Sequence, residues 1–181
     1  RKAMTMRLCV YCGSKRGGDV RHHDAAVSLG SEMAARGIDL VYGGGRVGLM
    51  GDVADAVLSA GGKVTGVIPR ALMDMEVGHL GATELVVVDD MHQRKAMMSR
   101  EADAFVALAG GYGTLEELFE MVAWSQLGIH AKPVGLLNTA GYYDHLLKFL
   151  DSSVQAGFLH APHRDLIKVA DDPVALLDQL S

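Results

Sequence analysis

The sequence has few cysteines, no long apolar run and no excess of positive charge. It contains two cysteines in 181 residues, and no apolar run approaches the roughly 20 residues that a membrane-spanning helix needs. The first residues, RKAMTMRLCVYCG, lack the apolar core and cleavage site of a secretory signal, which favours a cytoplasmic protein. The net charge of −5 argues against nucleic acid or an anionic membrane as the main partner.

The two cysteines are spaced as C-x-x-C, which is typical of redox and zinc sites. Cys9 and Cys12 lie in RLCVYCG, a predicted strand, where residues three apart point to opposite faces. No second cysteine pair completes a zinc site, and the histidines lack a metal spacing such as H-E-x-x-H. We therefore predict two ordinary strand cysteines, with no metal and no other cofactor.

What the sequence does contain is typical of a globular protein. Hydrophobic residues make up 49% of the chain and charged residues 22%. A length of 181 residues allows one well-cored domain and is too short for two of ordinary size. We predict a single domain over residues 1–181, with residues 1–6 as a loose tail.

Short apolar runs alternate with segments of helical periodicity along the whole chain. The apolar runs predict strands at residues 7–12, 38–42, 63–68, 84–88, 103–108, 133–137 and 166–169, the third broken by Pro69 and the last at an edge. The periodic segments predict helices at residues 22–36, about 52–60, 91–101, 115–127, 142–155 and 173–180. This alternation predicts an α/β fold, a doubly wound, mostly parallel, Rossmann-like sheet with helices on both faces.

The stretch Ala109–Glu120, AGGYGTLEELFE, follows one of these buried strands and opens a helix. Its glycines, Gly110, Gly111 and Gly113, allow an anion to approach the free N–H groups at the start of the helix. In a doubly wound sheet, ligands bind at the carboxyl ends of the strands, where this loop lies. The pattern predicts a phosphate-binding loop, with Glu117 one turn inside the helix.

A structural explanation of the same residues stays open. Thr114-x-x-Glu117 is also a capping box, in which the threonine caps the helix and the glutamate bonds back to the threonine N–H. A simple cap does not need three glycines, which favours the binding loop.

A second glycine loop, Gly43–Gly51, follows the strand at 38–42 and fits the dinucleotide pattern G-x-G-x-x-G. Two features weaken that interpretation. The loop follows the second strand, and no carboxylate for a ribose occurs in residues 63–70, although Arg70 suits a 2′-phosphate. An NADP-dependent oxidoreductase is therefore the weaker alternative. Ser14, in the turn after the first strand, is a further candidate ligand contact.

A basic pair, Arg94 and Lys95, opens the helix predicted at 91–101. At the carboxyl edge of the sheet this pair could clamp an anion, since the arginine offers a planar fork of donors. The alternative is a solvated helix face.

At this point the residues are similar to those of a known family. GGYGTLEE at 110–117 resembles the P-G-G-x-G-T-x-x-E signature of the LOG proteins, the cytokinin-activating nucleoside-monophosphate phosphoribohydrolases, and MHQRK at 91–95 is similar to their M-H-x-R-K. The resemblance extends to residues 43–51, 126–128 and 132–137, so it covers most of the chain. Many relatives carry the label lysine decarboxylase, but nothing here marks a Schiff-base lysine.

The resemblance implies hydrolysis of the N-glycosidic bond of an N6-modified adenosine 5′-monophosphate, or of AMP, by a homodimer. It implies Arg94 and Glu117 as the catalytic pair. The substrate contacts predicted from the matched motifs and the loops are Ser14, Gly44, Gly45, Glu76, Met91, Lys95, Gly110, Gly111, Tyr112, Gly113, Thr114, Leu115 and Glu116. The transition state resembles an oxocarbenium ion, so a carboxylate near the anomeric carbon could stabilise it or activate water, and the arginine could keep that carboxylate ionised.

Two residues depart from the family pattern. Ala109 replaces the proline before the glycines, which could loosen the loop, and Ala123 stands where relatives often carry threonine. A non-catalytic nucleotide-binding module of the same fold is therefore the main alternative function.

Overall fold

The computed structural model describes residues 4–181, and its centre is a seven-stranded sheet. The strand order is β4-β3-β2-β1-β5-β6-β7, and all six pairings are parallel. The strands are β1 (Arg7–Tyr11), β2 (Asp39–Tyr42), β3 (Val64–Pro69), β4 (Glu84–Val88), β5 (Ala104–Ala107), β6 (Val134–Leu137) and β7 (Ile167–Ala170). This confirms the predicted fold class.

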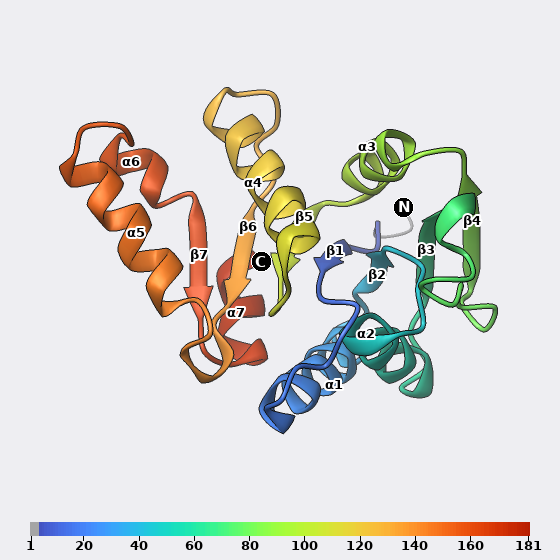
Figure 1. Cartoon of the computed structure of the whole chain (residues 1–181). Coiled ribbons are helices and arrows are strands. Elements are labelled where there is room, and N and C mark those ends of the chain that lie inside the picture. The colour runs from blue at the N-terminus through green and yellow to red at the C-terminus, as the bar shows by residue number, and fades with distance from the viewer. Residues whose placement is uncertain (1–3) are drawn as a thin grey trace.

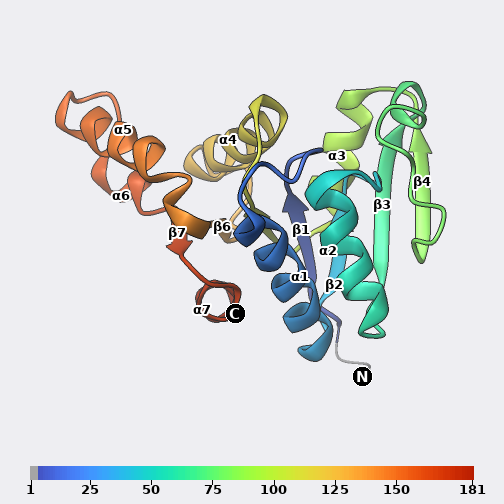
Figure 2. The ribbon, with the colours of Figure 1, turned by 60° about the horizontal axis from the view of Figure 1, so that its bottom comes forward.

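Helices cover both faces of the sheet (Figure 1). They are α1 (Val20–Ala35), α2 (Gly48–Ser59), α3 (Met91–Glu101), α4 (Tyr112–Gln126), α5 (Asp144–Gln155), α6 (Ala161–Arg164) and α7 (Pro173–Leu180), with the short turns η1 (Arg70–Leu72) and η2 (Thr139–Gly141). Helices α1, α2 and α7 pack on one face, and α3, α4 and α5 on the other (Figures 1 and 2).

The strand β1 shows how the two faces divide the apolar residues. Leu8 and Val10 belong to the core under α1 and α2, whereas Cys9 and Tyr11 belong to the core under α3 and α4. Cys12 packs on the side opposite to Cys9, and both thiols are free. The two cysteines therefore lie on opposite faces, as predicted, although Cys12 lies just beyond the last residue of β1.

The strand order changes direction between β1 and β5. These two strands are far apart in the sequence but adjacent in the sheet, where Leu8 pairs with Ala104. The loops after these two strands leave in opposite directions, one toward α1 and the other toward α4 (Figure 1). Such a switch point opens a crevice at the carboxyl edge of a parallel sheet. Both predicted glycine loops lie at this edge.

Several predicted boundaries are wrong. Helix α4 begins at Tyr112, with Gly111 as its N-cap, so Thr114 lies inside the first turn and the capping-box explanation fails. The segment at 142–143 belongs to the turn after η2, because Gly141 adopts a left-handed conformation there and α5 begins only at 144. Helix α6 and both short turns were not predicted, α1 starts two residues early, and Pro69 closes β3 instead of breaking it.

The predicted tail lies partly outside the described residues, because residues 1–3 are not described. Met6, at the other end of that segment, is ordered against the protein: its carbonyl accepts the Asp39 N–H (2.9 Å) and its side chain packs on the core. The tail prediction is therefore wrong for Met6.

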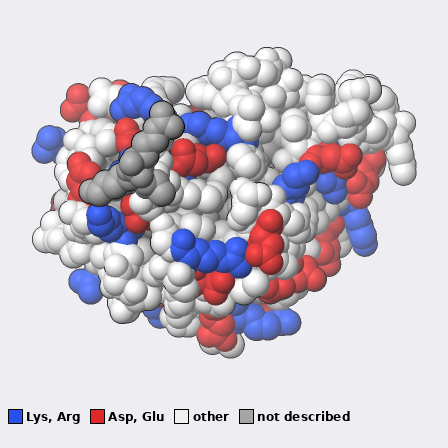
Figure 3. Space-filling view, turned by 180° about the vertical axis from the view of Figure 1, so that it is seen from behind, with Lys and Arg blue, Asp and Glu red and all other residues white. Residues whose placement is uncertain are grey.

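Acidic and basic side chains lie intermixed on the face seen in Figure 3, and the upper right part of that face carries few of either. Among the helices of residues 4–181, none is both long and apolar enough to cross a membrane.

Candidate active site

Arg94 lies buried beneath the carboxyl edge of the sheet and connects three segments. Its Nε donates to the carbonyl of Val67 in β3 (3.0 Å), and its Nη2 donates to the carbonyl of Gly43 after β2. The same Nη2 pairs with the Glu76 carboxylate (2.9 Å). Because no Cβ would fit beside this guanidinium at Gly43, the glycine is needed there for packing. Most of the donors of Arg94 are thus occupied by the protein, and Nη1 contacts only the Met91 sulfur (3.8 Å).

Glu76 lies on the segment between η1 and β4, which is held against the second glycine loop. The Arg46 N–H donates to the Glu76 carbonyl (3.0 Å), and Gly45 forms an isolated antiparallel bridge with Gly78. Between them Val77 has φ of +50°, a conformation that costs energy for a β-branched residue. The predicted contacts Gly44 and Gly45 therefore lie against the segment that carries Glu76, and Glu76 itself pairs with Arg94.

Glu117 faces the sheet from α4, where Tyr11, Cys9 and Arg94 are its neighbours. It is partly buried, and among residues 4–181 it has no hydrogen-bond or ion-pair partner. Burial raises the pKa of this carboxyl from its ordinary 4.5 to about 7, although the positive charge of Arg94 acts in the opposite direction. The prediction that Arg94 keeps Glu117 ionised is therefore wrong, because burial raises the pKa of Glu117 by more than the positive charge of Arg94 lowers it.

Lys95, the residue after Arg94, connects α3 to α4. Its ammonium pairs with Glu116 and with Glu120 (3.1 Å), and its side chain is mostly buried. The hydrogen bond from Lys95 to Glu116 raises the pKa of the lysine above its ordinary value. Glu120 was not predicted. Its spacing of four residues after Glu116, on one helix face, was the available signal.

The glycine loop at 110–113 contains glycines of two kinds. A Cβ at Gly110 would overlap the Thr114 hydroxyl, at 2.1 Å, because Thr114 is buried behind the loop. At Gly111 and Gly113 a Cβ would have no protein atom within 4 Å. Tyr112 between them is 95% exposed. Gly111 and Gly113 therefore border open space.

Two tyrosines after β6 hold this loop from behind. The Tyr142 hydroxyl donates to the carbonyl of Gly110 (2.6 Å), and the Tyr143 hydroxyl donates to that of Leu108 (2.6 Å). Ala109, at the family's proline position, is buried, and its carbonyl accepts the Gly13 N–H (3.0 Å). The loop is thus fixed by hydrogen bonds although the proline is absent.

A cavity of about 450 Å³ lies on the α1 side of the glycine loop, a volume typical of small-molecule sites. Its walls are the loop after β1, which carries the predicted contact Ser14, together with Gly110, Gly111 and Tyr142. Lys15 and Arg16 bring positive charge to this wall. Arg94 and Glu117 are not among its lining residues, so the glycine loop separates two groups of predicted residues.

The structure therefore sorts the predicted site residues into two groups beside one loop. Arg94 contacts Met91 and Glu76 and lies near Glu117, and Lys95 pairs with Glu116, whereas Ser14, Gly110 and Gly111 border the cavity. Leu115 packs toward the core of the α4 face. Ala123 lies further along α4, in an apolar trough shared with Phe119 and Val122. Among residues 4–181, no three His, Cys, Asp or Glu side chains are placed to hold a metal ion.

Comparison with known proteins gives relatives over nearly the whole chain. Residues 50–180 match the profile of a family described as "Possible lysine decarboxylase". A protein of Oryza sativa subsp. japonica named "Probable cytokinin riboside 5'-monophosphate phosphoribohydrolase" is 57% identical over 96% of this chain and 77% of its own length. A cytokinin riboside 5'-monophosphate phosphoribohydrolase of Arabidopsis thaliana is 52% identical over 96% and 82%.

Solved structures share the fold at lower identity. The Moco carrier protein from Chlamydomonas reinhardtii superposes with a TM-score of 0.72 at 26% identity, over 98% of each chain.

Proposed function

Because the chain belongs to the LOG family of cytokinin riboside 5′-monophosphate phosphoribohydrolases, we propose that it hydrolyses the N-glycosidic bond of adenine-type nucleoside 5′-monophosphates. The substrates are N6-modified adenosine 5′-monophosphates or AMP. In the reaction the bond between the anomeric carbon and the base nitrogen breaks, and water supplies a hydroxyl to the carbon and a proton to the base. The products are the free base and ribose 5-phosphate.

The observation that carries this proposal is the state of Glu117. It is a partly buried carboxyl with a pKa near 7, with no polar partner among the described residues, on the side of α4 that faces Arg94. A purely structural carboxylate in such a place is normally paired or hydrogen-bonded. In its ionised form Glu117 stabilises the positive charge that develops at the anomeric carbon and orients or activates the attacking water.

Arg94 and Lys95 serve the reaction in different ways in this proposal. Arg94 fixes the carbonyl groups of two strand ends and the Glu76 carboxylate, so it shapes the crevice beside Glu117. Its Nη1, whose one contact with the described residues is the Met91 sulfur, is the part that meets substrate. Lys95 exchanges one of its two carboxylate partners for the ligand, since Glu116 is largely exposed.

The phosphate of the substrate lies against the glycine loop at 110–113 in this proposal. The first N–H groups of α4 have no acceptor within the helix, and the positive end of the helix dipole favours an anion. The open space beside Gly111 and Gly113 is where the phosphoribose fits.

The first test is chromatography of the purified protein after incubation with isopentenyladenosine 5′-monophosphate and, separately, with AMP. We expect free base and ribose 5-phosphate, and the ratio of the rates gives the preferred base. The Glu117→Gln variant is the control, because it keeps the side-chain volume and removes the charge. It should keep the melting temperature within a few degrees and lose about 10²- to 10⁴-fold in kcat.

Two results contradict the proposal. If wild-type protein binds AMP and leaves it intact, the chain is a non-catalytic nucleotide-binding module, a function that this fold also permits, since the similar Chlamydomonas protein is a Moco carrier. If Glu117→Gln keeps full turnover, Glu117 is not the catalytic carboxyl.

We further propose that the protein is a homodimer. Between α4 and α5 runs an apolar trough of about 210 Å³ that Phe119, Val122, Ala123 and Leu150 line. Helix α5 has apolar side chains on one face and no fully buried residue, and Phe149 on it is 64% exposed. A second copy of the chain would cover this surface.

Light scattering tests the dimer directly, with an expected mass of twice the 19.3 kDa chain. Ala123→Arg places a charge in the trough and should shift the protein to monomer. Val174→Arg, on the far face of the sheet, is the matched control and should leave the dimer intact. A monomeric wild-type protein contradicts the proposal.

A further inference from the structure

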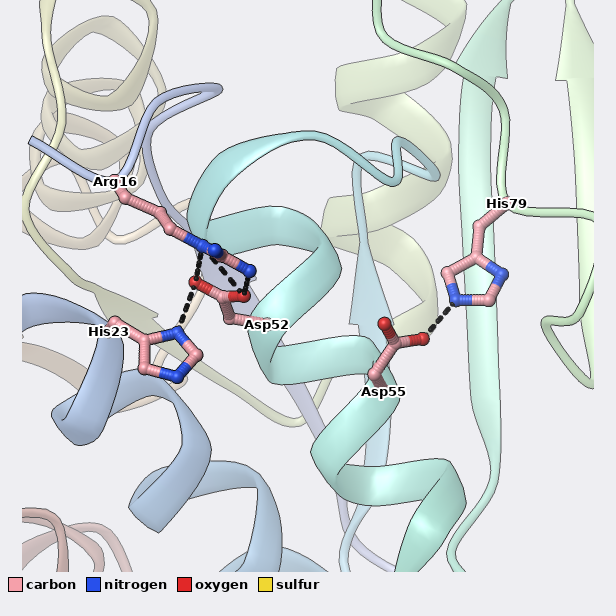
Figure 4. A network of polar contacts seen from close by, with 5 residues as sticks. All are labelled: Arg16, His23, Asp52, Asp55 and His79. Carbon is pink, nitrogen blue, oxygen red and sulfur yellow. Dashed lines mark hydrogen bonds and ion pairs between the residues drawn. The ribbon is translucent and has the colours of Figure 1, made fainter.

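A buried carboxylate on α2 holds the loop that forms one wall of the cavity (Figure 4). The side chain of Asp52 is only 4% exposed. Arg16 donates to it from Nε (2.9 Å) and from Nη2 (2.6 Å), which engages both carboxylate oxygens. His23 Nδ1 approaches the second oxygen (2.9 Å) from the first turn of α1. One carboxylate therefore joins α2, α1 and the loop after β1.

The loop of residues 13–19 has few other means of keeping its shape. It contains Gly13, Gly17 and Gly18, and glycine loses more conformational freedom on ordering than any other residue. Within residues 4–181, no backbone hydrogen bond is donated by the stretch from Ser14 to Gly18. Its main-chain attachments lie at its ends. The Gly13 N–H donates to Ala109 in the loop after β5, the Gly13 carbonyl accepts from Leu49 in α2, and Asp19 caps α1. The Arg16–Asp52 pair is the side-chain ion pair that fixes the middle.

The pairing also determines which positive charge of the loop faces the cavity unpaired. The charge of Arg16 is offset by Asp52, so Arg16 acts as an anchor. Lys15, the next residue on the loop, is exposed and has no ion pair with another described residue. The cavity thus combines one available ammonium group with main-chain N–H groups that have no acceptor, and Arg21 pairs with the one carboxylate of its lining, Asp19, so the lining suits a phosphate.

We propose that Asp52 is a positioning residue, which acts through Arg16 to hold the 13–19 loop where Ser14 and Lys15 bind the phosphate end of the substrate. The proposal rests on the proposed function for the identity of the ligand, a sugar 5-phosphate. Asp55, one turn further along α2, forms a separate pair with the buried His79 (2.6 Å), on the segment that carries Glu76 (Figure 4). The Asp55–His79 pair holds the other side of the crevice and is not part of this proposal.

The test measures ribose 5-phosphate binding by calorimetry, together with kcat and KM for AMP, in wild type and in Asp52→Asn. We expect binding to weaken about tenfold and KM to rise by a similar factor, with kcat within about twofold, because the reacting groups are untouched. Arg16→Gln should give the same result, and the double variant should be no worse than either single one, because the two residues act as a pair.

The matched control is Asp178→Asn, which breaks an aspartate–arginine pair with Arg36 (2.8 Å) at the other end of α1. It should change neither binding nor KM. Arg16 has a mostly exposed side chain, so Arg16→Gln tests the proposal even if Asp52→Asn fails to fold.

The opposite electrostatic outcome overturns the proposal. If Asp52 only neutralises Arg16, its removal frees a positive charge at the cavity, and ribose 5-phosphate binds as tightly as before or more tightly. Absence of binding in wild type also overturns it. If wild type binds ribose 5-phosphate, Asp52→Asn weakens the binding and no base is released from AMP, the proposed hydrolysis fails while the role of Asp52 stands.

Discussion

Burial and charge act on Glu117 in opposite directions, and burial wins. Because burial raises its pKa to about 7, Glu117 exchanges between protonated and ionised forms near neutral pH before substrate enters. Arrival of a developing positive charge at the anomeric carbon favours the ionised form. The site thus retains a carboxylate whose charge is incompletely compensated by the protein, which is useful for stabilising an oxocarbenium ion.

The raised pKa predicts a pH dependence of stability that Glu117→Gln removes. The folded protein binds a proton at Glu117 between pH 4.5 and about 7, whereas the unfolded chain has released it. The free energy of unfolding of wild type should therefore fall, through this group, as pH rises from 4.5 through 7, and then level off. Urea unfolding at several pH values should show that the free energy of unfolding of Glu117→Gln rises relative to that of wild type over this interval. A constant difference across the interval would contradict the prediction.

At the scale of elements, the glycine loop before α4 predicts which glycines serve the ligand and which serve the fold. Gly111→Ala should leave the free energy of unfolding within about 0.5 kcal/mol, because its φ is negative and its Cβ meets open space. It should nevertheless raise KM at least tenfold, since the methyl group occupies the space proposed for phosphoribose. Thermal unfolding and steady-state kinetics measure the two effects.

Gly110→Ala is the matched comparison for that loop. Its Cβ would overlap the buried Thr114 side chain, so we expect a loss of about 1–3 kcal/mol in stability as well as activity. If both alanine variants were equally stable and equally active, the glycines would have no role in binding.

The start of α2 is a second place where a glycine lets two segments approach closely, here Gly48 and the loop after β1. Gly48 has φ of +58°, and a Cβ there would lie 2.3 Å from the Ser14 carbonyl carbon. Gly37 has a similar φ of +69° with no atom nearby. Gly48→Ala should therefore destabilise the protein by at least about 2 kcal/mol more than Gly37→Ala, since only the former adds a steric clash to the backbone strain. Chemical denaturation of the two variants measures the difference.

The elements themselves were largely predictable, because buried parallel strands are continuous apolar runs. The predicted strands at 84–88 and 103–108 agree with β4 and with β5 extended by one residue at each end. The start of α4 could not be predicted in this way. Thr114 has the chemistry of an N-cap, but the N-cap of α4 is Gly111, a residue without a side-chain acceptor. Side-chain pairs between distant residues, such as Arg16–Asp52, were also not predicted, because no local sequence pattern encodes which charged residues of different elements come into contact.

At the scale of the whole molecule, one sheet separates two apolar layers, and this predicts how the protein unfolds. Leu29 lies in the layer under α1, and Leu118 in the layer under α4. Because both layers share the strands, Leu29→Ala and Leu118→Ala should each lower stability by about 2–5 kcal/mol and shift the same single transition. Fluorescence of the one tryptophan, Trp124 on α4, should coincide with circular dichroism in both variants. Separate transitions would mean that the layers unfold independently.

The sequence also predicted that both glycine loops lie at the carboxyl edge of the sheet, because that edge of a parallel sheet collects the loops that follow its strands. It did not predict the division of the site residues between those that border the cavity, such as Ser14 and Gly110, and those that do not, such as Arg94 and Glu117. That division depends on the strand order, which places β5 beside β1, and several orders are compatible with the same alternation of strands and helices.

The pairing of β1 with β5 has a consequence for how the protein is made. Leu8 and Ala104 are paired in the sheet but far apart in the sequence. A ribosome must therefore synthesise α1 to α3 before the site has both of its walls. Pairing of such remote segments is a slow event in folding. A nascent or half-refolded chain therefore has both α2 carboxylates and no glycine loop to receive a phosphate, and hydrolytic activity becomes a late and specific marker that the central strands have joined.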